Sequence, residues 1–147
     1  MTASQTEQRP VTELYAEVQL FYARHFQLLD GGDTQAWADT FTPDGAFFPP
    51  TLPEPVRGRA ALAAGAAKAH AAFEEQGVQR RHWHGMVDVR PREDGSVFVR
   101  CYALIFVTPA GGEPRLHLTC ICEDVLVHTD DGLRVAERRV HRDDLPR

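Results

Sequence analysis

The sequence is short of lysine, of excess positive charge and of long apolar runs, and the last two shortages each exclude a class of protein. Arginine supplies 15 of the 16 cationic side chains, which indicates either carboxylate recognition or, more simply, the coding composition of the source. The formal net charge of −5 gives no basic excess with which to bind nucleic acid. The sequence contains no run of about 18 apolar residues and no apolar signal core. We therefore expect a cytoplasmic protein with no nucleic-acid partner and no membrane partner.

Cysteine is scarce as well, with only Cys101, Cys120 and Cys122 in the sequence. Their odd number and their positions inside hydrophobic runs favour buried free thiols over a disulfide framework. Cys120 and Cys122 form a C-x-C pair, but zinc sites normally add a second pair or histidines at ligand spacing. We therefore predict no metal at this pair.

Helical periodicity marks the first half of the sequence, and strand patterns mark the second. Apolar residues over 11–29 recur on one helical face, which predicts a helix that ends at Asp30-Gly31-Gly32. We expect a short helix over 34–41, a brief strand over 46–48 and an alanine-rich helix over 59–77. Long strands separated by hairpin loops are expected over 79–90, 96–108, 115–129 and 133–142.

This order of elements predicts an α+β fold in one domain over residues 1–147. The chain is 147 residues long and 43% hydrophobic, which suits a single core. A long antiparallel sheet has to curl round the first helix to bury the apolar faces of both. We therefore expect a cone-shaped sheet wrapped around three N-terminal helices.

Three motifs carry a resemblance to a known family. They are F-Y-x-R-x-F-Q-L-L-D-x-G-D-x-x-x-W-A-D-x-F-T-P-D-G-A-F at 21–47, G-R-x-A-L at 58–62 and H-W-H-G at 82–85. Together they resemble the NTF2-like superfamily, and more narrowly its SnoaL-like branch in bacterial aromatic-polyketide tailoring, including actinorhodin-type pathways. The sequence is also similar to scytalone dehydratase and to the β subunits of ring-hydroxylating dioxygenases. The resemblance implies a cone with a mostly apolar pocket, used for acid/base chemistry without a metal or organic cofactor, or for binding alone.

His82 is the first catalytic candidate, because it matches a pocket histidine of scytalone dehydratase. Strand alternation places His84, Met86 and Asp88 on the same side as His82. An imidazole titrates near neutral pH and can act as acid or base. The alternatives are a hydrogen-bonded core histidine and a metal site, in which His117 would complete an H-x-H set with Asp88. The helix-rich residues before the motif do not suit the all-β fold that uses such sets, so no metal is predicted.

Glu137 and Asp39 are the candidate carboxylate partners of His82. Alternation places Glu137 on one side of the last strand with Leu133 and Val135, and the resemblance implies a base on that strand. The alternative for Glu137 is an exposed ion pair with a nearby arginine. Asp39 follows Trp37 closely and would reach the pocket mouth if its short helix forms a lid; otherwise it contacts backbone.

Aromatic residues supply candidate pocket walls for a flat polycyclic ligand. Tyr102 could orient a phenol or quinone oxygen, as could His84, and His117 could face either the pocket or a dimer interface. Scytalone dehydratase has a Tyr-Asp pair where Phe26 and Gln27 stand here, which argues against the same dehydration chemistry. The candidate wall residues are Tyr22, Phe26, Phe48, Phe98, Tyr102 and Phe106.

The function expected from these residues is cofactor-independent cyclisation or dehydration of a polycyclic aromatic polyketide intermediate, with His82 as acid/base. The protein is expected to be a homodimer that associates through its sheet. A second hypothesis is a protein that binds and protects a reactive quinone-type intermediate without making bonds. A third is a structural partner resembling a dioxygenase β subunit.

Overall fold

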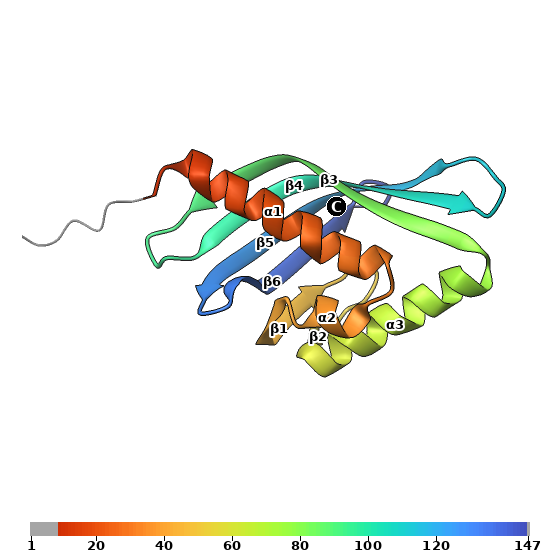
Figure 1. Ribbon diagram of the computed structural model, residues 1–147, viewed down its shortest axis with the longest axis horizontal. Coiled ribbons are helices and arrows are strands. Elements are labelled where there is room, and N and C mark those ends of the chain that lie inside the picture. The colour runs from red at the N-terminus through yellow and green to blue at the C-terminus, as the bar shows by residue number, and fades with distance from the viewer. Residues whose placement is uncertain (1–8, 147) are drawn as a thin grey trace, which may run out of the picture.

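A six-stranded sheet curls over one long helix in the computed structural model, which describes residues 9–146 (Figure 1). The strand order across the sheet is β2-β1-β6-β5-β4-β3. The predicted α+β fold, with three helices and a curved sheet, is confirmed. The elements are α1 (Val11–Asp30), α2 (Thr34–Ala38), β1 (Phe41–Phe48), β2 (Val56–Arg57), α3 (Arg59–Glu75), β3 (Val78–Pro91), β4 (Val97–Pro109), β5 (Arg115–Thr129) and β6 (Gly132–Arg142).

The four long strands form the antiparallel meander that the turn signals predict. The N-terminal part of the sheet differs from the prediction. Strand β1 begins at Phe41 rather than Ala46, and it pairs with β6 in parallel. The two-residue strand β2, which lies in a segment predicted to be loop, pairs with β1 in antiparallel fashion. The parallel contact places β1 beside the last strand and extends the sheet beyond the meander.

A bulge in β3 changes which side chains face inward. The register with β4 shifts between Gly85 and Asp88, and Met86 has a φ of 51°. An extra residue in one strand reverses the alternation of side chains beyond it. His82 and His84 therefore face the concave side as predicted, whereas Met86 and Asp88 are exposed and do not share that side.

A second irregularity changes the phase of β6. The pairing with β5 passes from Val125↔Glu137 to Leu126↔Val135, which leaves Ala136 as the extra residue. Leu133 and Val135 are buried before the irregularity, and Arg138 is buried after it. The predicted alternation, which placed Glu137 in line with Leu133 and Val135, is therefore wrong.

Helix α1 lies across the concave face of the sheet and supplies one side of the core (Figure 1). Its buried stripe contains Leu14, Val18, Tyr22, Phe26 and Leu29. After α1 the chain turns at two glycines and passes close to α3. A Cβ atom on Gly32, which has a φ of 82°, would lie 2.4 Å from the His70 ring, so glycine is required there for both conformation and space.

Three further predictions concern the cysteines, membrane spans and the number of domains. All three cysteines are buried and free, as expected. Among residues 9–146, no helix is long and apolar enough to span a bilayer. The single-domain assignment to residues 1–147 stays a prediction, because residues 1–8 and 147 lie outside the described part of the chain.

Candidate functional site

A cavity of about 440 Å³ opens between the concave face of the sheet, α1 and α3. This volume is in the range of small-molecule sites. The alanine-rich helix α3 buries only Leu62 in the core, and its small residues Gly65, Ala66 and Ala69 line the cavity instead. The shortage of large side chains on α3 therefore creates space for a ligand. The apolar wall also includes Phe26, Leu29, Trp37, Phe47, Val56, Ala103, Ile105, Leu118 and Val140.

His82 and Asp30 form a hydrogen-bonded dyad at this cavity. The His82 Nδ1 atom lies 2.6 Å from Asp30 Oδ1, and the His82 backbone N–H donates to Asp30 Oδ2 at 2.9 Å. The two side chains are only 11% and 7% exposed. A carboxylate accepts hydrogen bonds, so Nδ1 carries the proton and Nε2 is the basic nitrogen of the ring. Because His82 lines the cavity, the dyad has the arrangement of a general base held by an orienting carboxylate.

The protein holds His82 in its neutral form at pH 7. Burial lowers the pKa of His82 below its ordinary value, and the charges of Arg80 and Arg138 act in the same direction. The hydrogen bond and charge of Asp30 oppose this lowering without reversing it. A neutral imidazole with a free Nε2 is the protonation state that a base requires.

His84 lies beside His82 as part of an aromatic wall. Its ring stacks on the Phe26 ring with centroids 3.8 Å apart, and the same Phe26 ring lies 5.8 Å from that of His82. Burial, followed by the charge of Arg138, lowers the pKa of His84 well below its ordinary value. His84 is therefore a neutral, partly apolar surface against which a planar ligand can pack.

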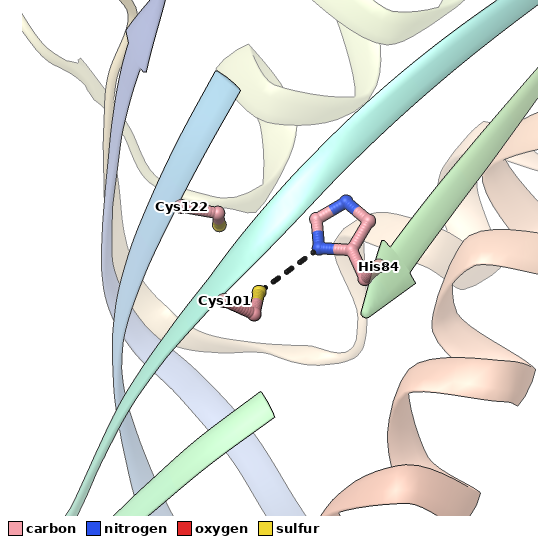
Figure 2. Close-up of side chains that lie close together, drawn as sticks. All are labelled: His84, Cys101 and Cys122. Atoms are coloured by element: carbon pink, nitrogen blue, oxygen red, sulfur yellow. Dashed lines mark hydrogen bonds between the residues drawn. The ribbon is translucent and has the colours of Figure 1, made fainter. Parts of the chain in front are cut away.

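His84 also approaches two buried thiols, as Figure 2 shows. Its Nδ1 atom lies 3.4 Å from Cys101 Sγ, and the ligand-type atoms of His84, Cys101 and Cys122 all lie within 4.8 Å of one another. A metal at these atoms would require thiolates. A hydrogen bond with Cys101, then burial, raises the pKa of the Cys122 thiol well above its ordinary value. Without a bound metal, the Cys122 thiol is therefore protonated and packs in the core.

A buried ion pair between Arg138 and Asp124 lies on the floor of the cavity. Two guanidinium nitrogens, Nε and Nη2, donate to the two carboxylate oxygens, each at 2.8 Å. Tyr22 donates its hydroxyl proton to the same carboxylate at 2.8 Å. Burial alone would lower the pKa of Arg138, but the neighbouring groups, of which the charge of Asp124 is the strongest, together outweigh burial and raise the pKa, so Arg138 stays charged. Arg138 lines the cavity and brings a fixed positive charge to it.

His25 also holds the Arg138 guanidinium in place by hydrogen bonding. Its Nε2 atom accepts from Arg138 Nη1 at 2.8 Å and from Trp37 Nε1 at 3.2 Å. Its Nδ1 atom lies 2.6 Å from Thr40 Oγ1, and that hydroxyl donates its proton to the Trp37 carbonyl. Nδ1 must therefore carry the proton of a neutral ring, which agrees with the lowering of the His25 pKa by burial and by Arg138. The network fixes both the tautomer of His25 and the position of Arg138.

The structure brings only some of the predicted site residues together. His82, His84 and Phe26 line the cavity. Tyr22 is buried beneath it and faces Asp124 rather than the cavity. Phe47 faces the cavity, whereas Phe48 lies on the other side of β1 against Arg57 and Arg139.

Both candidate carboxylate partners of His82 lie outside the cavity lining. The β6 irregularity directs Glu137 to the outer side, where it accepts from Arg139 Nε at 2.8 Å. Asp39 is exposed at the end of α2 and accepts from Gln35 at 3.1 Å. The partner of His82 is Asp30 instead.

The other face of β4 carries the aromatic residues that were expected to line the pocket. The inward positions of β4 are Val97, Val99, Cys101, Ala103 and Ile105, so Phe98, Tyr102 and Phe106 point away from the cavity. Tyr102 is 51% exposed. His117 is exposed at an irregularity in the β4–β5 pairing.

Sequence reasoning missed Asp30, Asp124 and Arg138, although each left a signal. Asp30 ends a helix, where the helix dipole disfavours a carboxylate, so another interaction must hold it there. Asp124 follows Cys120 and Cys122 on the inward face of β5. A buried charge without a partner is costly, so a buried partner for Asp124 is expected. Arg138 lies after the β6 irregularity, which strict alternation does not anticipate.

This cavity, enclosed by a curved sheet and three helices, defines an NTF2-like cone. The SnoaL-like domain model matches residues 10–139, and the chain belongs to this family. No functionally curated protein matches the chain.

Solved structures of similar proteins agree with this assignment. Aln2 from a Streptomyces species is 37% identical with a TM-score of 0.84, over 93% of this chain and 96% of Aln2. ActVI-ORFA from Streptomyces coelicolor is 35% identical with a TM-score of 0.84, over 90% of this chain and 99% of that one. A Catenulispora acidiphila protein in complex with S-DNPA is 38% identical with a TM-score of 0.78, over 90% and 96% of the two chains. A putative dioxygenase β subunit from Novosphingobium aromaticivorans, 18% identical with a TM-score of 0.72 over 93% and 94%, shares the fold alone.

Proposed function

We propose that this protein binds an aromatic polyketide intermediate in its cavity and catalyses a proton transfer that leads to cyclisation or dehydration. The observation that carries the proposal is the Asp30–His82 dyad, which joins a neutral imidazole to an orienting carboxylate at the edge of an apolar cavity. Both outcomes begin with removal of a proton from carbon next to a carbonyl group. The chemistry uses the side chains of the chain and needs no metal or organic cofactor.

His82 Nε2 would take the proton, and Asp30 would stabilise the imidazolium that forms. The two hydrogen bonds from His82 to Asp30 hold the ring and its tautomer before the substrate binds. Such positioning reduces the reorganisation needed in the transition state. In a dehydration, the imidazolium would return its proton to the leaving hydroxyl group; in a cyclisation, it would protonate the new alkoxide.

Arg138 would stabilise the negative oxygen of the enolate. Asp124 and His25 take three of its five N–H donors, and the guanidinium lines the cavity with its charge intact. A fixed charge in a water-poor site stabilises developing charge more strongly than water does. His84 and Phe26 would hold the rings of the substrate by stacking.

The direct test is conversion of an aromatic polyketide intermediate by the purified protein, followed by chromatography and mass spectrometry. Wild type should form product faster than the buffer blank, with and without EDTA. His82→Gln should still bind the intermediate and lose about 10²–10⁴-fold in rate. Wild-type conversion that His82→Gln leaves unchanged would refute the assignment of the base.

A binding protein without catalysis is the second candidate function. The similar Catenulispora acidiphila protein was solved in complex with S-DNPA, which supports small-molecule binding in this family. A protecting protein would slow the spontaneous decay of a quinone-type intermediate and yield no new product. Product analysis with His82→Gln therefore separates the two functions. The third hypothesis, a dioxygenase β-subunit role, has only the shared fold in its favour.

A further inference from the structure

Three metal-ligating side chains meet at the cavity from three neighbouring strands, as Figure 2 shows. Cys101 on β4 and Cys122 on β5 are directly opposed in the antiparallel register, and His84 comes from β3. The His84 Nδ1 atom lies 3.4 Å from Cys101 Sγ, and one ring nitrogen and both sulfur atoms lie within 4.8 Å of one another. The proposed proton transfer uses neither thiol, so this cluster has no role in it.

The spacing of these atoms is close to that of a tetrahedral zinc site. Zinc binds sulfur at about 2.3 Å and nitrogen at about 2.0–2.1 Å, so the ligand atoms of such a site lie about 3.5–3.8 Å apart. Movements of about 1 Å or less would bring all three atoms of the cluster to that spacing. Thiolate and imidazole are also the ligands that zinc prefers in proteins.

The charges around the cluster suit a divalent cation bound by two thiolates. Cys101 and Cys122 are 1% and 0% exposed, and the two negative charges of their thiolates would balance Zn²⁺, which leaves the buried site neutral. A bound cation also deprotonates its thiol ligands outright. The Cys122 Sγ atom lies 3.5 Å from Asp124 Oδ1, and the ion pair with Arg138 already compensates that carboxylate.

His84 gives the site an oriented ligand and the cavity gives it an entry path. The stacking of the His84 ring on Phe26 fixes the plane of the imidazole, in the way that outer contacts orient metal ligands in other proteins. His84 and Cys122 both line the cavity, so an ion can reach the sulfur and nitrogen atoms without unfolding the sheet.

We infer that His84, Cys101 and Cys122 form a zinc site, which binds one Zn²⁺ through the imidazole Nδ1 and two thiolates. The two thiols release their protons to solvent as the ion binds, and no group is oxidised or reduced. Three protein ligands leave the fourth position of the tetrahedron for water or an oxygen atom of a ligand in the cavity. The bound ion links β3, β4 and β5. This inference goes beyond the proposed function and does not rest on it.

The test uses the full chain, reduced and freed of metal with EDTA, and Co²⁺ as the spectroscopic probe for the zinc site. Anaerobic titration of wild type should end at one Co²⁺ per chain, with a thiolate-to-cobalt charge-transfer band and the strong visible bands of tetrahedral cobalt. Zn²⁺ should displace the cobalt and remove these bands, because zinc binds such ligands more tightly. It should also raise the Tm, since the site exists only in the folded chain.

Two variants of Cys101 test which residues bind the ion. Cys101→Ser and Cys101→Ala should both lose the charge-transfer band and weaken Zn²⁺ binding by at least about 100-fold. The reason is that loss of a residue that only orients a ligand already costs about 10- to 100-fold in metal affinity. Circular dichroism reports whether each variant is folded, and the wild-type spectrum tests the site whether or not the variants fold.

Cys120→Ala is the matched control. Cys120 is buried, lies two residues from Cys122 on the same face of β5 and is not part of the cluster, so this variant should keep the bands and the affinity. A wild type without the charge-transfer band, or bands that survive in Cys101→Ser and vanish in Cys120→Ala, would overturn the inference. Conversion of the aromatic intermediate by the metal-free protein tests the proposed function separately, so either can fail alone.

Discussion

His82 and the carboxylate of Asp30 are joined by two hydrogen bonds, although the two residues lie 52 positions apart in the chain. One bond involves the ring and the other the backbone, so Asp30 fixes the strand as well as the side chain. The dyad connects the end of α1 to the middle of β3. Its chemistry therefore depends on the docking of that helix against the sheet.

The first prediction concerns Asp30. Asp30→Asn should lower kcat by about 10²–10³-fold, because an amide neither fixes the His82 tautomer nor stabilises the imidazolium. KM should change little, since Asp30 does not line the cavity. Steady-state kinetics measure both constants. Asp33→Asn is the control, because Asp33 is exposed and its side chain does not cap α2. A kcat for Asp30→Asn within twofold of wild type would contradict the dyad.

The second prediction is the pH dependence of turnover. His82 acts as a base in its neutral form, and its pKa lies below the ordinary value of 6.5. The rate should therefore be constant near pH 7 and fall about tenfold per pH unit only below the pKa of His82. A pH–rate profile, with an NMR titration of the His82 ring, measures both. A fall in rate that begins above pH 6.5 would assign the base to another group.

The third prediction is that acid destabilises the fold through its buried histidines. The pKa values of His25, His82 and His84 are all lowered in the folded state. The unfolded chain therefore binds more protons below about pH 6.5. This stability is fully present above that pH and is lost as the pH falls, at up to about 1.4 kcal/mol per pH unit for each histidine. Urea denaturation between pH 7.5 and about 5 measures the slope. His25→Gln should reduce that slope, and an unchanged slope would contradict the argument.

The fourth prediction concerns the cavity wall on α3. Ala66→Leu should fill part of the cavity and weaken ligand binding at least about tenfold, a loss of about 1.4 kcal/mol. The free energy of unfolding should change by less than about 1 kcal/mol, because both residues favour helix and the space already exists. Calorimetry and urea denaturation measure the two effects. Ala67→Leu, at an exposed position, is the control. Unchanged binding by Ala66→Leu would place the ligand elsewhere.

The fifth prediction contrasts adjacent arginines of β6. Arg138→Met should cost about 3–5 kcal/mol in the free energy of unfolding, because Asp124 would be left charged and buried. Arg139→Met should cost less than about 1 kcal/mol, because its ion pair with Glu137 is exposed. Equal losses in urea denaturation would show that the β6 irregularity does not direct these side chains as described.

The predicted homodimer stays a prediction, and the outer face of the sheet is the surface on which to test it. Trp83, Tyr102 and Leu116 are 66%, 51% and 49% exposed there. Tyr102→Arg should convert a dimer into a monomer in light scattering, because a charge at a buried contact is costly. Leu20→Arg on α1, where the side chain is equally exposed at 52%, should leave the mass unchanged. A dimer that persists in Tyr102→Arg would exclude this face.

The sequence by itself determined the helices, the four-strand meander, the family and the inward direction of His82 and His84. These features follow from local periodicity, from turn residues and from motifs short enough to lie within one element. They are visible in the sequence because neighbouring residues decide them. Phe26 was also recognised as a cavity residue for this reason, since it lies on the apolar stripe of α1.

Only the tertiary structure decided which groups meet His82. Bulges in β3 and β6 reverse side-chain alternation, and the bulge in β6 turns Glu137 outward and Arg138 inward. Asp30 reaches His82 because the end of α1 docks beside β3, a contact between residues 52 positions apart. Bulges and helix docking depend on how the whole sheet curves and packs. The alternation of residues within one strand therefore does not predict the bulges or the docking.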